Sequence, residues 1–147
     1  MLPGSTMLPG SSIRVVAAVL YDALGRVLIA QRPAGKAMAG LWEFPGGKLE
    51  AGEGELEALR RELQEELGVR VDSARAVLEL THDYPDRQVR LSVWAVSGYE
   101  GVPAGIEDQV LRWVAPTELR ALPLLPADQP IVDFLEDAYQ TSLRQAR

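Results

Sequence analysis

Several residue types that support catalysis or cross-linking are absent or rare in this chain of 147 residues. It has no cysteine, which excludes disulfides, thiol catalysis and cysteine-ligated zinc. Its single histidine, His82, cannot build a site of several histidines, and a lone histidine is more often structural or exposed than catalytic. Any catalysis must therefore use other oxygen and nitrogen groups.

An excess of basic charge and a long apolar run are also missing. The net charge of −6 disfavours polymeric nucleic acid, which needs a basic surface, so we expect small-molecule partners. No apolar run of membrane-spanning length occurs, and the N-terminus lacks the pattern of a signal peptide, so we expect no membrane association and a cytoplasmic location. The sequence leaves monomer and homodimer open.

Length and composition indicate one domain. The chain is 47% hydrophobic, enough for a sizeable core. The motif MLPG occurs twice within the first dozen residues, so we predict a flexible tail over residues 1–12 and a single folded domain over residues 13–147.

Apolar patterning predicts alternating strands and helices. Ile13–Leu20 and Val27–Gln31 are expected to form a hairpin around the turn Tyr21–Gly25. Further strands are expected at residues 76–81, 89–97 and 110–114, with a loop at 98–108 and an amphipathic helix at 129–143. The pattern indicates a sheet covered by helices.

The most informative segment is Gly47–Val69, where a Gly-rich turn precedes a Glu-rich helix. Glu62, Glu65 and Glu66 project within about one quadrant of a helix, because each residue turns it by about 100°. Such crowded carboxylates should repel one another unless they hold divalent cations, which prefer oxygen ligands.

An ordinary charged surface is the competing interpretation, because Glu-rich helices are common. Against it, an apolar stripe backs the carboxylates, and Gly68 occupies the position of a left-handed cap. The stripe comprises Leu56, Leu59, Leu63 and Leu67. The carboxylates should therefore lie at the edge of a packed interface with fixed geometry.

This segment resembles the Nudix box, G-x5-E-x7-R-E-U-x-E-E-x-G-U, where U is aliphatic. It matches at every fixed position: Gly47, Glu53, Arg61, Glu62, Leu63, Glu65, Glu66, Gly68 and Val69. A motif with so many specified positions is strongly specific. Similarity to the MutT branch extends to residues 28–32, 41–47, 84–87 and 125–130, and implies an α/β fold, the Nudix-type α/β/α sandwich with a mixed β-sheet between helices.

The resemblance also implies a Mg²⁺ site, with Mn²⁺ as an alternative ion. Its implied ligands are Gly46, through its backbone carbonyl, and Glu62, Glu65 and Glu66, with Glu107 or its neighbour Asp108 from a later loop. Glu62 is the expected general base and Glu53 its rival. Arg61 more simply orients carboxylates, and Glu53 stabilises the helix start if it is not the base.

Four further residues match positions that contact the nucleotide in MutT-like proteins, and each has a simpler alternative role. Arg32 and Arg87 are either ligands or surface arginines, and Phe44 either stacks on a base or fills the core. Asp128 stands where the 8-oxo-dGTP enzymes have Asn and resembles the CTP and 5-methyl-dCTP branch, although Asp before Pro130 also suits a helix N-cap.

The resemblance thus implies an enzyme, a hydrolase that cleaves a nucleoside triphosphate to a monophosphate and pyrophosphate. Removal of 8-oxo-dGTP, which protects DNA replication from mutation and counts as DNA repair in the wider sense, is the first expectation. Hydrolysis of CTP or 5-methyl-dCTP is the second. A third alternative, of another class, is a Nudix-fold sensor that binds a nucleotide without cleaving it, although a sensor has no need for the intact box.

Overall fold

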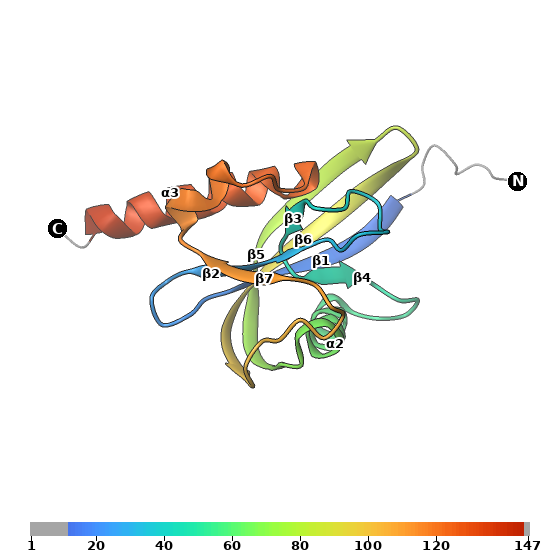
Figure 1. Ribbon diagram of the computed structural model, residues 1–147, viewed down its shortest axis with the longest axis horizontal. Helices are drawn as coiled ribbons and strands as arrows, with labels where there is room; N and C mark the ends of the chain where they lie inside the picture. The colour runs from blue at the N-terminus through green and yellow to red at the C-terminus, as the bar shows by residue number, and fades with distance from the viewer. Residues whose placement is uncertain (1–11, 146–147) are drawn as a thin grey trace, which may run out of the picture.

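The computed structural model describes residues 12–145. The expected tail, residues 1–12, therefore lies outside the described residues except for Ser12, where the first strand begins. The strands are β1 (Ser12–Leu20), β2 (Val27–Gln31), β3 (Trp42–Glu43), β4 (Gly46–Lys48), β5 (Arg70–Tyr84), β6 (Arg87–Glu100) and β7 (Leu111–Val114). The helices are α2 (Glu55–Leu67) and α3 (Gln129–Gln145), with short 3₁₀ turns η1 (Pro116–Ala121) and η2 (Pro126–Asp128) before α3 (Figure 1).

The strands form two sheets. One has the order β4-β1-β6-β5, in which β1 runs parallel to β6 and antiparallel to β4. The other has the order β3-β2-β7 and is antiparallel. The expected mixed α/β architecture is present, although its strands divide between two sheets.

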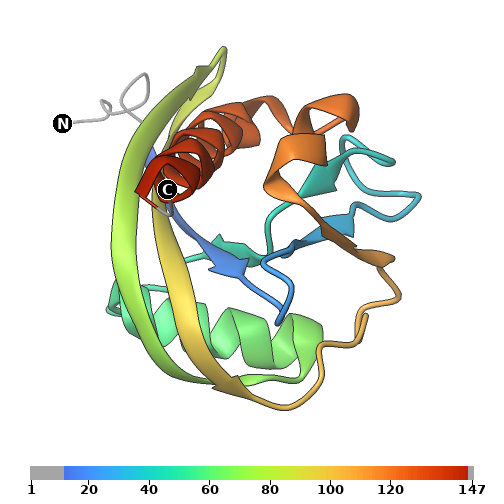
Figure 2. The same cartoon turned by 90° about the vertical axis from the view of Figure 1, so that its left-hand side faces the viewer.

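Strand β1 separates two hydrophobic cores. Val16, Ala18 and Leu20 pack with α2, whereas Ala17 and Val19 pack with β2 and α3. This alternation follows from the period of two in a strand. Figure 2 shows α3 and α2 on either side of β1.

The predicted hairpin of β1 and β2 is wrong. The two strands belong to different sheets and share only the isolated bridge Tyr21–Val27. The turn between them does form, because the Asp22 carboxylate accepts the backbone N–H groups of Leu24 and Arg26, each at 2.9 Å. β1 instead pairs with β4 and β6, and β2 pairs with β3 and β7.

Helix α2 ends as the sequence predicts. At its start, the Glu57 side chain accepts the Gly54 N–H at 3.0 Å. At its end, Gly68 has φ 71°, the left-handed conformation that glycine adopts without strain. Leu59, Leu63 and Leu67 are fully buried, which stabilises the helix by about 2 kcal/mol per side chain. Leu56 is only half-buried, and Ala58 joins the buried face instead.

Other boundaries differ from the predictions mainly in length. β5 and β6 extend well beyond residues 76–81 and 89–97, and they form one long antiparallel hairpin with register shifts near its start. β6 reaches Glu100, which shortens the expected loop. Within residues 12–145, no helix is long and apolar enough to cross a membrane.

Candidate active site

A cavity of about 300 Å³ lies where the two sheets meet. Its walls come from β1, the end of β2, the segment 43–48, the tip of the β5–β6 hairpin, and the loops at 107–109 and 125–128. Glu66 of α2 lines one part of it and Asp128 another. Predicted site residues from distant parts of the chain therefore share one cavity.

The carboxyl groups of Glu62 and Glu66 lie close enough to shift each other's pKa. Burial, together with the nearby charge of Glu62, raises the pKa of Glu66 to about 9. Burial also raises the pKa of Glu62, against the lowering effect of Glu66 and Arg61. Two carboxyl groups this close fit a divalent cation, because such ions are bound by oxygen ligands and would offset the repulsion between the two charges.

Two glycines bring β4 against this pair. The Gly46 N–H donates to Glu66 Oε1 at 3.4 Å. A methyl group on Gly47 would overlap the Glu62 carboxylate, and one on Gly46 would overlap the Val16 carbonyl. The Gly-Gly sequence thus allows the strand to approach the acids closely.

Arg61 lies at the centre of the neighbouring charges. Its guanidinium binds Glu53 through two hydrogen bonds of 2.7 and 2.9 Å, and also contacts Glu62 at 3.1 Å and Glu65 at 3.3 Å. The hydrogen bonds from Arg61, together with one from the Glu50 N–H, lower the pKa of Glu53 to about 2. In return, Glu53 raises the pKa of Arg61. These contacts suit an orienting arginine.

The remaining predicted ligands lie farther from the pair. The Glu65 side chain is 54% exposed and turns toward Arg61. Glu107 is exposed but lines the cavity, and its charge adds to the raised pKa of Glu66. Among the described residues, no three carboxylate or imidazole groups already form a complete cation site.

The four predicted nucleotide contacts all line the cavity. Asp128 is buried, and its Oδ2 accepts the Phe44 N–H at 2.9 Å. Burial, reinforced by the charge of Glu43, raises the pKa of Asp128 to about 7 despite that hydrogen bond and nearby Arg32. Within residues 12–145 the Asp128 carboxylate has no hydrogen bond to the first turn of α3, so the N-cap alternative is not observed.

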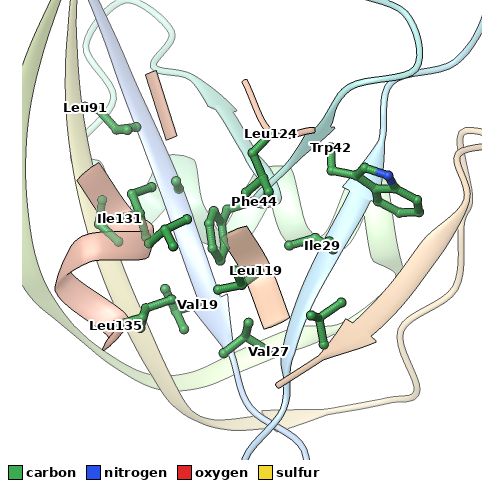
Figure 3. Packing of buried hydrophobic residues seen from close by; sticks show 14 residues of the cluster. Val19, Val27, Ile29, Trp42, Phe44, Leu91, Leu119, Leu124, Ile131 and Leu135 are labelled. Atoms are coloured by element: carbon green, nitrogen blue, oxygen red, sulfur yellow. The ribbon is translucent and has the colours of Figure 1, made fainter. Parts of the chain in front are cut away.

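Phe44 packs among the core residues and is only 4% exposed (Figure 3), while also bordering the cavity. Arg32 donates to Glu43 at 3.2 Å and to the Ala37 carbonyl at 2.7 Å, which fixes its guanidinium. Arg87 lies 5.5 Å from the centre of the Tyr84 ring. Both arginines are thus held in place at the cavity wall.

Sequence reasoning missed several cavity residues, among them Glu43, Tyr84 and Gln109. Glu43 pairs with Arg32, Tyr84 contacts Arg87, and Gln109 bonds the end of α2. Glu43 and Tyr84 lie within segments that carried the resemblance and could have been found there. Nothing in the sequence pattern distinguished Gln109.

The fold and the cavity define a hydrolase class that comparison with known proteins confirms. The model of the NUDIX domain matches residues 15–134, so the chain belongs to the Nudix family, as the box predicts. Enzymes of this family act on phosphoanhydride bonds and generally use a divalent metal ion. The chain is therefore a Nudix hydrolase.

Relatives place it near two activities. It is 41% identical over 121 residues to the CTP pyrophosphohydrolase of Escherichia coli, covering 82% of this chain and 89% of that protein. It is 34% identical to the 8-oxo-dGTP diphosphatase of the same organism, covering 84% and 96%. The solution structure of the E. coli ORF135 protein superposes with a TM-score of 0.76 at 39% identity, covering 93% and 94% of the two chains.

A solved structure from work on MutT of Aliivibrio salmonicida and Vibrio cholerae agrees as well. It has a TM-score of 0.75 at 32% identity and covers 85% of this chain and 97% of its own. These matches confirm the expected Nudix α/β fold and the MutT-like branch.

Proposed function

We propose that this protein is a Mg²⁺-dependent nucleoside triphosphate pyrophosphohydrolase, releasing a nucleoside monophosphate and pyrophosphate. The observation that carries the proposal is one cavity with the Glu62–Glu66 acid pair near one end and the buried Asp128 at another wall. The acid pair suits a metal-bound triphosphate, and the wall at Asp128 suits a nucleobase.

The metal would be held by Glu62 and Glu66, with the backbone carbonyl of Gly46 and, after side-chain movement, Glu65 and Glu107 completing the set. When bound, Mg²⁺ or Mn²⁺ neutralises phosphate oxygens and makes water a better nucleophile. Glu62 accepts the proton of the attacking water. Glu53 is the weaker candidate, because a carboxylate with a pKa of about 2 is a poor base and both its oxygens are bound by Arg61.

Arg32, Arg87 and Asp128 line the same cavity: we assign Arg32 to a phosphate and Arg87 and Asp128 to the nucleobase, while the Phe44 N–H holds Asp128. The Oδ1 atom of Asp128 is left to accept a hydrogen bond from the base. Since the pKa of Asp128 is about 7, its Oδ1 can also carry a proton near neutral pH and then donates a hydrogen bond to the base, as the NH₂ group of an Asn would. This supports 8-oxo-dGTP as the substrate and removal of oxidised nucleotide before DNA replication as the task.

A second candidate is hydrolysis of CTP or 5-methyl-dCTP. An ionised Asp128 only accepts hydrogen bonds and suits the amino group of cytosine. The 41% identity to a CTP pyrophosphohydrolase favours the same choice.

The deciding experiment measures kcat/KM for 8-oxo-dGTP, dGTP, CTP and 5-methyl-dCTP with Mg²⁺ and with Mn²⁺, following pyrophosphate release. A preference for 8-oxo-dGTP supports the first candidate, and a preference for cytosine nucleotides replaces it with the second. If none of these nucleotides released pyrophosphate, the proposed hydrolytic activity would be contradicted and a nucleotide sensor would be favoured. We place this activity in the cytoplasm, acting on a small-molecule nucleotide as a monomer or homodimer.

A further inference from the structure

The loop that carries Glu107 is tied to the last turn of α2. The Ala104 N–H donates to the Leu67 carbonyl at 3.0 Å, and the Ile106 N–H donates to the Glu66 carbonyl at 3.2 Å. Carbonyls in the last turn of a helix lack partners within the helix, so this loop supplies them. The backbone of Glu66, one of the paired acids, is therefore part of the loop's anchor.

Gln109 completes this anchor with its side chain. Its Nε2 donates to the Glu66 carbonyl at 2.9 Å, and its Oε1 accepts the Glu107 N–H at 2.9 Å. One amide thus joins the backbone of two acids from separate elements. Because the joint needs both a donor and an acceptor, neither Glu nor Met can reproduce it.

The loop conformation is specific as well. Asp108 has φ 65°, a left-handed conformation that is uncommon outside glycine, and its N–H donates to the Gly105 carbonyl at 3.0 Å. A methyl group on Gly105 would overlap the Gln109 carbonyl. Such a conformation persists where the surroundings enforce it.

We propose that Gln109 is a positioning residue, which fixes the Glu107 backbone against the end of α2 so that the Glu107 carboxylate faces Glu66 across the cavity. This proposal deepens the proposed function and depends on its assignment of Glu107 to the metal set. Outer groups that orient a ligand typically change metal affinity by about 10- to 100-fold when removed.

The test is a double-mutant cycle of Gln109→Met and Glu107→Gln, read as Mn²⁺ affinity of the nucleotide-free protein. Each single variant should weaken Mn²⁺ binding by about 10-fold or more, and the double variant should bind no more weakly than Glu107→Gln alone. Gln64→Met, on the exposed side of α2, is the matched control and should bind as wild type. Effects that multiply, or a Glu107→Gln variant with unchanged affinity, would overturn the proposal.

Amide hydrogen exchange gives a second readout. Gln109→Met should accelerate exchange of the Glu107 N–H. Gln109→Glu should leave this N–H protected, because the acceptor oxygen remains. Equal exchange in wild type and both variants would contradict the hydrogen bond between Gln109 and the Glu107 N–H. Gln109→Asn replaces Gln109→Met if the latter fails to fold, because its shorter side chain cannot span both partners. Hydrolysis by wild type is measured separately, so loss of the proposed function and loss of the Gln109–Glu107 coupling give different results.

Discussion

Replacing Asp128 by Asn should change how stability depends on pH. The ordinary carboxyl pKa of 3.8 rises to about 7 in the folded protein, mainly by burial. The protonated form is therefore the one that folding favours, so the stabilisation is complete below about pH 4 and is lost as the pH rises through 7. Each pH unit between these values is worth about 1.4 kcal/mol, which gives about 4 kcal/mol in total.

Asn has nearly the same shape and can still accept the Phe44 N–H, but it does not titrate. The free energy of unfolding of Asp128→Asn should therefore rise relative to wild type by about 4 kcal/mol between pH 4 and pH 8. Urea unfolding at half-unit pH steps measures this difference directly. The exposed Asp137→Asn on α3 is the matched control and should show no such trend.

Comparing the two proteins cancels other titrating groups, apart from Glu43 and Arg32, whose charges act on Asp128 itself. A difference that stays constant within about 1 kcal/mol across this range would show that Asp128 is ionised in the folded protein at all these pH values. The argument for a donor at neutral pH would then fail, and with it the main structural support for 8-oxo-dGTP over cytosine nucleotides.

Three other substitutions test the acid pair and its surroundings. Glu62→Gln should lower kcat by about 10²- to 10⁴-fold at saturating Mg²⁺, whereas the exposed Glu79→Gln should not; activity within a few-fold of wild type would remove Glu62 from the mechanism. Arg61→Met should restore the pKa of Glu53 from about 2 toward 4.5. Wild type loses the stability of this pairing as the pH falls from 4.5 through 2, so the variant should show a flatter acid limb in urea unfolding; an unchanged limb would contradict the pairing. Gly47→Ala should lower Mn²⁺ affinity, because the added methyl group displaces the Glu62 carboxylate. Wild-type affinity in this variant would contradict the need for a glycine there, since β4 would have moved away from α2 to make room.

Local features of the site were predictable from sequence. The end of α2 follows from Gly68, as expected, whereas at its start Glu57, not Glu53, accepts the Gly54 N–H. The acid pair follows from helix geometry, because Glu62 and Glu66 are one turn apart. A motif with fixed spacing within one helix thus translates directly into three dimensions.

Long-range pairing was not predictable in the same way. The turn at Asp22 is real, but no local signal shows that β1 pairs with β6 rather than with β2. β3 and β4 are too short for periodicity to detect, and β4 contains two glycines, which strands usually avoid. The Asp128–Phe44 hydrogen bond joins residues far apart in the chain, so the sequence could only suggest the helix N-cap instead.

That hydrogen bond has a consequence for how this enzyme can change. Asp128 is fastened to Phe44, and Gly46, two residues further along the chain, contacts Glu66. Two residues of backbone span at most about 7 Å, so residues 44–46 form a short rigid connection between the proposed nucleobase site and the acid pair. Substitutions at residue 128 that are selected for a different nucleobase should therefore also change the turnover of the original nucleotide. Recovery of that turnover should require compensating substitutions within residues 44–46.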